Sequence, residues 1–417
     1  MGHQGSQKRQ HKSVASTDII SNLPEVIKDK ILCCLPIEEA VGTCLLSRKW
    51  RYTWASMTEL SFSSDDFASI NKFVYFTNMF LSLHNGPVLK FELNTQWGQM
   101  LSDRGDTHRW ILMLSRNGVK EIQIRTRIWE DYKIPSSFFS CDQLEYVYLQ
   151  ECAFQLPPLF KGFKLLHTLH LEGFRASGDD IGDLVASCPN LEKLTLSRSL
   201  RLIDINIKSI KLRTLSIDGV FNHLNLHAPH VTLAFIKLPV CIGDEPRAGC
   251  NNNISQFIGS LSDIENITLL GQVFEYAAHG ILPGKMPPSF NRLTEITLGI
   301  DLGNLKEAQA AHCLFRSAPN LRRIDLQLTY RGYSTTPTSC FWDSMDPEVR
   351  LFNKLDVVCM TNFAGTYAEL RFLKHLLEGA PILRKVQIEE NGKLDRVTLK
   401  HLLKMRRVSK DAEVIVL

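Results

Sequence analysis

A short apolar pattern recurs along most of the chain. Apolar residues occupy positions 1, 4 and 6 of a six-residue segment, and successive segments start 21 to 34 residues apart except across one gap of 52. Because side chains alternate along a strand, positions 4 and 6 share one face. The pattern predicts strands at Val88–Leu93, Val119–Ile124, Leu144–Leu149, Leu166–Leu171, Leu191–Leu196, Leu212–Ile217, Ile264–Leu269, Leu293–Leu298, Leu321–Leu326, Leu355–Met360 and Leu383–Ile388, with a degenerate strand at His230–Ile236 inside the long gap.

Helical patterns lie between several of these strands. Each of three predicted helices ends just before a Pro or Ala-Pro turn, where a helix cannot continue. A period of about 20–30 residues with one short strand is typical of leucine-rich repeats. The predicted fold class is α/β, a solenoid with a curved parallel sheet, and a doubly wound domain is disfavoured because no glycine-rich phosphate loop follows a strand. The helices are Asp179–Ser187, Lys306–Ser317 and Tyr367–Glu378, and Val397–Met405 and Glu413–Leu417 are a last helix and strand.

The run from residue 18 to 62 has a different, denser apolar pattern. Ser21 or Asn22 is a suitable cap for a first helix, and Pro36 separates it from a second. A third helix is predicted after Ser47, with Trp50 and Trp54 one turn apart beside basic residues. A segment of about 45 residues is too short to form a core alone. The run therefore predicts docking to another protein, with packing on its own solenoid as the alternative.

The order of residues in this run resembles an F-box in its plant form. Leu-Pro pairs at Leu23–Pro24 and Leu35–Pro36 and the segment Leu45–Arg51 carry the resemblance, whereas Gly42 and Cys44 depart from it. The resemblance implies docking on a Skp-type adaptor and, through it, on a cullin–RING ubiquitin ligase. The implied adaptor-binding residues are Leu23, Pro24, Ile27, Ile31, Leu32, Leu35, Pro36, Val41, Leu45, Ser47, Trp50 and Trp54.

Two further resemblances extend over the rest of the chain. Residues 80–340 resemble the irregular leucine-rich repeats of plant F-box proteins, and Phe352–Ile388 resembles an FBD module. The expected organisation is a disordered basic tail over 1–16, an F-box over 17–62, a linker with an N-terminal helix over 63–87, a solenoid over 88–340, and an FBD-like module with a C-terminal cap over 341–417.

Composition excludes several classes of protein. The net charge of +4 is too small to predict nucleic-acid binding, and no window approaches the about 18 uninterrupted apolar residues of a membrane span. The polar N-terminus lacks the apolar segment of a secretory signal. The 11 cysteines are scattered without a C-x-x-C pair, as expected for a reducing compartment. We expect a protein of the nucleus or cytoplasm, without a membrane or nucleic-acid partner.

Candidate catalytic or metal-binding residues are weak. His223, His227 and His230 have helical spacing, but Leu224, Leu226 and Pro229 indicate extended backbone that separates them. Cys141 and Cys152 have no partnered base in the sequence, and hydrolase, zinc-protease and phosphate-loop motifs are absent. The sequence therefore predicts a protein without catalytic residues, metal or cofactor, and not an enzyme.

A target would bind the polar strand positions that face the inside of the curve. Tyr146, Tyr148 and His170 form the aromatic cluster there, which favours them as substrate-binding anchors. The alternative is that they pack beneath the loop Arg125–Ser140, whose Trp129 and Tyr132 need shelter. Long insertions at Pro239–Asn253, Gly271–Pro288 and Tyr330–Asp346 could cover the same surface.

The favoured hypothesis is the substrate-recognition subunit of a Skp–cullin–F-box ligase, which presents an unknown target protein for ubiquitination. One alternative is a small-molecule receptor, by analogy with plant hormone receptors that join an F-box to leucine-rich repeats. The concave cations Arg125, Lys193, Arg323 and Lys385 are dispersed among acids, which disfavours a basic ligand pocket. The other alternative is an F-box scaffold that acts outside any ligase.

Overall fold

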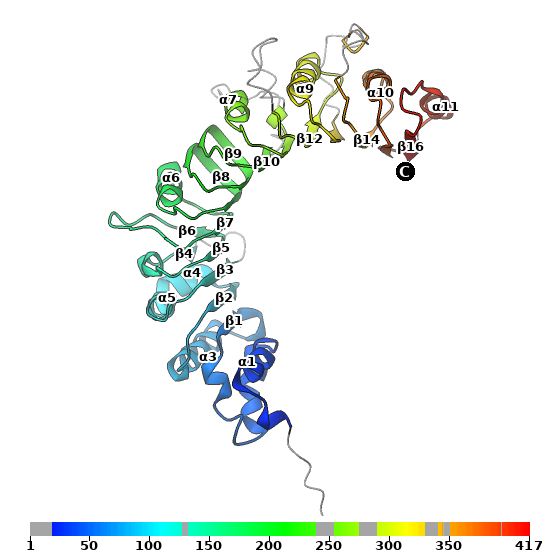
Figure 1. Cartoon of the computed structure of the whole chain (residues 1–417). Coiled ribbons are helices and arrows are strands. Elements are labelled where there is room, and N and C mark those ends of the chain that lie inside the picture. Colours follow the sequence, from blue (N-terminus) through cyan, green and yellow to red (C-terminus); the bar gives the residue numbers. More distant parts are fainter. Residues whose placement is uncertain are drawn as a thin grey trace, which may run out of the picture.

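The chain forms a curved solenoid with its strands on the inner side of an arc and its helices on the outer side (Figure 1). The computed structural model describes residues 19–126, 132–238, 254–274, 290–329, 341–343, 345, 351–392 and 394–417. The N-terminal helical module sits at one end of the arc and the last strand at the other. The tail predicted over 1–16 lies outside the described residues.

One parallel sheet runs through the described chain. Its strands follow the chain in order, apart from a separate two-stranded sheet made by β4 (Tyr132–Lys133) and β6 (Cys152–Ala153). Each strand pairs in parallel with the next, for example Val357 with Lys385 and Val358 with Val386. The strands of the main sheet are β1 (Glu59–Ser63), β2 (Lys90–Thr95), β3 (Glu121–Thr126), β5 (Tyr146–Gln150), β7 (Thr168–Glu172), β8 (Lys193–Lys208), β9 (Thr214–His227), β10 (Leu233–Leu238), β11 (Asn266–Gly271), β12 (Glu295–Ile300), β13 (Arg323–Leu328), β14 (Val357–Phe363), β15 (Lys385–Glu390) and β16 (Glu413–Val416).

The six-residue pattern explains why these strands form and which way they face. In each predicted segment the residues at positions 1, 4 and 6 are buried, as with Leu355, Val358 and Met360 in the repeat of β14. The intervening positions remain partly exposed on the inner face. Buried apolar residues from neighbouring repeats therefore stack into one continuous core. The predicted repeats, including the degenerate one at β10, are confirmed.

Helices cover the outer side of the sheet. The predicted helices near Asp179, Lys306, Tyr367 and Val397 are confirmed within one residue at each end as α6, α9, α10 and α11. Side-chain caps start all four of them, including Thr366 at the N-terminus of α10, which forms a capping box with Glu369. The helices of the solenoid are α3 (Ile70–Leu83), α4 (Gly98–Arg104), α5 (Asp106–Arg116), α6 (Gly178–Ala186), α7 (Ile254–Gly259), α9 (Leu305–Ser317), α10 (Tyr367–Gly379) and α11 (Arg396–Lys404).

The sheet departs from the predicted pattern at two places. It begins at β1, inside the segment expected to be F-box only, because Leu60 and Phe62 alternate with polar residues and pair beside β2. Strands β8 and β9 run on past the six-residue segment and stay paired as far as Lys208 and His227. Between these two strands the described chain has no return helix, so extended backbone replaces it.

The N-terminal module has two α-helices, not three. These are α1 (Glu25–Cys33) and α2 (Ile37–Gly42), each preceded by a proline at its N-cap. The predicted third helix is replaced by turns and a short 3-10 segment, η3 (Thr53–Ser56). Ser47 does not cap it, because its hydroxyl instead lies 2.8 Å from the hydroxyl of Ser21 and joins the start of the module to its end.

Candidate protein-binding sites

One side of the N-terminal module packs on the chain itself. Trp54 lies with its ring centroid 5.0 Å from that of Phe80 in α3, and its indole N–H donates to the carbonyl of Arg51 at 3.2 Å. Leu32 and Trp50 are also buried in the same core. This side therefore caps the first strand of the solenoid.

This packing corrects part of the expected adaptor-binding set. Leu32, Trp50 and Trp54 were predicted to face a partner, and the chain buries all three. The physical reason is that α3 and β1 present Phe80 and Phe62 to the module, which supplies the core that the module lacks. These three side chains are therefore part of the core of the chain.

The other side of the module is apolar and exposed. Ile27 and Ile31 stand one turn apart on α1 with 41% and 38% exposure, and Leu45 and Leu46 near η2 (Thr43–Leu45) are 88% and 67% exposed. Exposed large apolar side chains gathered in one short segment mark an interaction surface. The remaining predicted residues divide between exposed Pro24 and Pro36 and partly buried Leu23, Leu35, Val41 and Ser47.

The three aromatic residues predicted on the inner face lie together. Tyr146 and Tyr148 are both on β5, and His170 on the adjacent β7 is paired directly with Tyr148 in the sheet. The imidazole centroid lies 5.7 Å from the ring of Tyr146 and 6.0 Å from that of Tyr148. All three side chains are partly exposed, so their faces are accessible from the inside of the arc.

A chain of charged residues fixes this aromatic cluster. Arg125 forms an ion pair with Glu92, and its guanidinium carbon lies 4.9 Å from the ring centroid of Tyr148. The Tyr148 hydroxyl donates to the carboxylate of Glu172, which pairs with Arg198 at 2.6 Å. Because each member holds the next, the rings are oriented before any partner arrives, which lowers the entropy cost of binding.

The backbone beside the cluster is strained. Glu151 directly after β5 and Arg198 within β8, where the register shifts, have φ of 53° and 52°, a left-handed conformation that residues with a Cβ rarely adopt. Between them Gly173 takes the same conformation, and a Cβ there would meet the Glu151 carboxylate at 2.2 Å. The Arg198 guanidinium lies 3.4 Å from the Glu151 carboxylate. Such strain persists where surrounding contacts hold it and is common at functional sites.

Partial burial keeps the cluster uncharged at neutral pH. Burial, reinforced by the hydrogen bond to Glu172, raises the pKa of Tyr148 to about 12, and burial also raises the pKa of Tyr146. Burial together with nearby Lys193 lowers the pKa of His170 below its ordinary value of 6.5. The cluster therefore offers neutral aromatic faces framed by paired charges, a surface suited to proteins.

The predicted shelter for Tyr132 lies elsewhere. Tyr132 is fully buried in β4, which contacts α4 on the outer side of the sheet and not the inner aromatic cluster. Trp129 and nearly all of the three long insertions lie outside the described residues. The expectation that Tyr132 packs over Tyr146, Tyr148 and His170 is therefore wrong.

The cysteines and histidines considered as catalytic or metal-binding candidates do not come together into a site. The Cys141 thiol is buried, which raises its pKa to about 12, and burial likewise raises the pKa of the Cys152 thiol. The ring of His230 pairs with Asp263 at 3.0 Å, while His223 and His227 lie in β9. Among the described residues, no group of three His, Cys, Asp or Glu side chains is placed to hold a metal.

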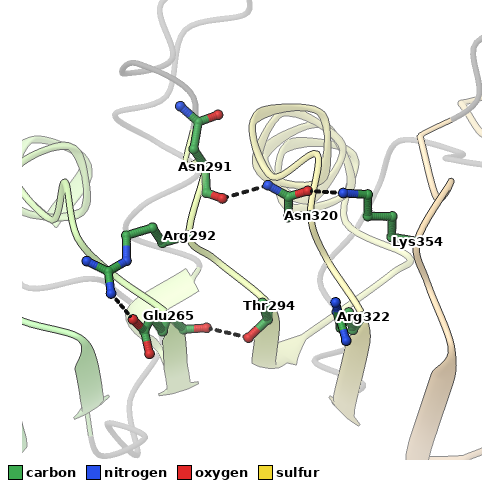
Figure 2. Close-up of a pocket in the computed structure, with 7 residues that line it drawn as sticks. All are labelled: Glu265, Asn291, Arg292, Thr294, Asn320, Arg322 and Lys354. Atoms are coloured by element: carbon green, nitrogen blue, oxygen red, sulfur yellow. Dashed lines mark hydrogen bonds and ion pairs between the residues drawn. The ribbon is translucent and has the colours of Figure 1, made fainter.

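A recess that the sequence did not predict lies at the edge where β11, β12 and β13 begin (Figure 2). Asn320 is central to it: its amide N–H donates to the carbonyl of Asn291 at 2.7 Å, and its oxygen accepts from Lys354 at 2.6 Å. The Pro-Asn-Leu turn before β13 is the sequence signal that could have found this contact, since the same turn precedes β8. The recess is lined by Glu265, Asn291, Arg292, Thr294, Asn320, Arg322 and Lys354.

Comparison with known proteins places the chain among relatives of similar architecture. An F-box domain model matches residues 20–61, and a model of the LRR repeats of FBD-associated F-box protein At5g56370 matches residues 107–244. F-box/FBD/LRR-repeat protein At1g13570 of Arabidopsis thaliana is 30% identical over 96% of the chain and 99% of its own length. FBD-associated F-box protein At1g66310 of the same plant is 25% identical over 98% of both chains.

These matches agree with the structure in the N-terminal module and in the middle of the solenoid. The F-box match covers α1, α2 and the start of β1, and the repeat match covers the part of the solenoid that carries the aromatic cluster. No helix in the described part of the chain has the length and apolar character to cross a membrane. F-box proteins of this kind act as adaptors, and the chain belongs to the F-box/FBD/LRR-repeat protein family of plants.

Proposed function

We propose that this protein is the substrate-recognition subunit of a Skp–cullin–F-box ubiquitin ligase. The observation that carries the proposal is that the N-terminal module buries some of its large apolar side chains on the solenoid and leaves others exposed. A module held firmly by its own chain, with large apolar side chains left in water, is built to receive a second protein. In this proposal a Skp-type adaptor covers Ile27, Ile31 and Leu45 and links the chain to a cullin.

The target protein binds the inner face of the arc in this proposal. Tyr146, Tyr148 and His170 offer preoriented aromatic faces, and aromatic residues dominate the energy of protein interfaces. The chain then acts by proximity: it holds a target lysine beside a charged ubiquitin carrier and so raises the effective concentration of the reacting groups. The chain itself needs no catalytic residue for this role.

The adaptor part of the proposal is tested by co-purification. The tagged protein is expressed in plant cells, and recovery of the Skp-type adaptor and cullin is compared among variants. We expect Ile31→Asp/Leu45→Asp, and separately Leu23→Ala/Pro24→Ala, to lose the adaptor with little change in melting temperature. Leu159→Asp is the matched control, because Leu159 is 90% exposed but lies on the solenoid. Undiminished adaptor binding by both double variants would refute docking through this side.

The target part is tested in the same cells by proximity labelling under proteasome inhibition. Tyr146→Ala/His170→Ala is expected to lose labelled proteins that the wild type enriches, while adaptor binding is unchanged. The control is Thr268→Ala/Thr297→Ala, which alters polar positions facing the same side on β11 and β12. A labelled set that is identical in both double variants would exclude the aromatic cluster as the target site.

A further inference from the structure

The recess beside β11–β13 has the chemistry of an anion site. Its cavity volume is about 320 Å³, and three cations and one carboxylate line it, which leaves two positive charges. The carboxylate is Glu265, and Arg292 is hydrogen-bonded to it. Figure 2 shows the Glu265 pair on one side of the recess and the Asn291–Asn320–Lys354 chain on the other.

Arg322 stands apart from these pairs. It is exposed, lines the recess, and makes no ion pair or side-chain hydrogen bond with any residue in the described part of the chain. Asp356 on the same edge forms its ion pair with Arg384, which is the main cause that lowers the pKa of that carboxyl, and the charge of Arg322 lowers it further without an ion pair between the two. With respect to the described residues, the five N–H donors of the Arg322 side chain are therefore open to a ligand.

The hydrogen bonds that join Asn291, Asn320 and Lys354, called the asparagine ladder below, have a second copy elsewhere in the solenoid. The second copy shows which parts of the recess are structural. Before β8, the amide of Asn190 donates to the carbonyl of Lys164 at 2.7 Å, and Lys211 donates to the Asn190 oxygen at 2.6 Å. This repeats the geometry of Asn291, Asn320 and Lys354 almost unchanged. The residue two places after the asparagine is Glu192 in one copy and Arg322 in the other. The ladder thus forms without an arginine there, and Arg322 is an addition to it.

We propose that the recess binds a phosphate monoester. The guanidinium of Arg322 matches two phosphate oxygens at once, and the Lys354 ammonium retains further N–H donors beyond the one given to Asn320. A phosphate monoester carries about −1.5 to −2 charges at neutral pH, which balances the two excess positive charges of the residues that line the recess. A carboxylate would leave one positive charge uncompensated. The volume also exceeds that of a phosphate group, so the residue or small molecule that carries it fits as well.

This site is separate from the proposed ligase function. It lies at the edge of the sheet where strands begin, in the repeats of β11–β13, whereas the aromatic cluster lies on the inner face of β5 and β7. The phosphate group can be borne by a protein side chain or by a small molecule, and both present the same oxygens.

The test measures binding to the full-length protein by isothermal titration calorimetry at low ionic strength. The probes are inorganic phosphate and the peptide Gly-Ala-phosphoserine-Ala-Gly, with its unphosphorylated form as reference. We expect Arg322→Gln and Lys354→Met each to weaken phosphate-dependent binding about tenfold or more. Lys211→Met and Arg213→Gln are the controls: Lys211 contacts Asn190 as Lys354 contacts Asn320, and Arg213 is an exposed arginine two residues further along the chain.

The arms of the experiment separate the outcomes. Tighter binding of the phosphopeptide than of inorganic phosphate supports a protein-borne group, and equal or tighter binding of inorganic phosphate supports a small-molecule source; either result supports the site. Binding that falls equally in the control variants would mean general electrostatic attraction and would overturn the proposal. Failure of both probes to bind at millimolar concentration would overturn it as well. Arg322 and Lys354 are exposed, so melting curves should show that all four variants fold.

Discussion

At the scale of single residues, similar apolar side chains in the N-terminal module have opposite environments. Trp54 is 8% exposed and Leu45 is 88% exposed, although only eight residues separate them. The difference comes from Phe80, which lies on α3 and contacts Trp54 from outside the F-box segment. The sequence indicates that such residues need burial, but it does not say whether the same chain or a partner provides it.

Replacement of Trp54 should therefore affect folding more than docking. We expect Trp54→Ala to lower the free energy of unfolding by about 3–5 kcal/mol, because a large cavity opens beside Phe80. Leu45→Ala should change it by less than about 0.5 kcal/mol, since little packing is lost. Urea denaturation measures both free energies, followed by the circular dichroism of the backbone because that signal does not depend on the replaced tryptophan. Equal, small effects in the two variants would contradict the burial of Trp54 in the core of the chain.

At the scale of elements, α9 and α10 begin with the same device. In α10, the Glu369 carboxylate turns back to accept from the backbone N–H of Ala364 at 3.1 Å and of Thr366 at 2.9 Å. In α9, Glu307 accepts from the backbone N–H of Asp301 at 2.9 Å. In both cases the loop that enters the helix is tied to its first turn, which fixes the angle between strand and helix.

The capping box of α10 predicts a specific order of stabilities. Glu369→Ala should lower the free energy of unfolding by about 1–2 kcal/mol, because two loop amides lose their acceptor. Glu369→Gln should retain most of that stability, since an amide oxygen still accepts one hydrogen bond. Glu389→Ala, at an exposed position on the following strand, is the control and should have almost no effect. Chemical denaturation measures the series; a Gln variant as unstable as the Ala variant would show that charge, and not capping, is what matters.

Most elements follow from the sequence because their signal is local. Three apolar positions in six residues predicted most of the repeats, and a proline shortly after the helix predicted the ends of α6, α9 and α10. The extra length of β8 and β9 was not predictable in this way, since extended backbone replaces the helix only because neighbouring strands pair. For the inner face, alternation predicted Tyr146, Tyr148 and His170 together, but the ion pairs that orient them depend on register between repeats. The recess at Arg322 likewise needs three repeats side by side.

At the scale of the whole molecule, the solenoid is held together by contacts between neighbouring repeats. Each repeat touches only the next, so its stability depends on every interface between successive helices. One interface stands out: Trp342 lies between α9 and α10, with its ring centroid 6.4 Å from that of His312 and 5.7 Å from that of His375. Two histidines packed against a buried aromatic make this interface sensitive to protons.

Burial lowers the pKa of both histidines below their ordinary value of 6.5, and for His312 the nearby His375 and Arg316 lower it further. The unfolded chain therefore binds protons at a higher pH than the folded chain does. Stability is complete above about pH 6.5 and falls as the pH drops through that value toward the lowered folded pKa values. We expect the melting temperature to decrease between about pH 7.5 and about pH 5.5.

The double variant His312→Gln/His375→Gln should reduce that decrease, because glutamine does not titrate. The loss should be partial and not complete, since burial also lowers the pKa of His84 and His170, which remain in the variant. His167→Gln is the control: His167 is exposed on the edge of the sheet, and its replacement should leave the pH dependence unchanged. Differential scanning calorimetry across the pH range measures all three proteins. If the double variant and the wild type lose the same number of degrees, protonation at the α9–α10 interface does not govern acid stability, and the solenoid must yield first at another pair of repeats.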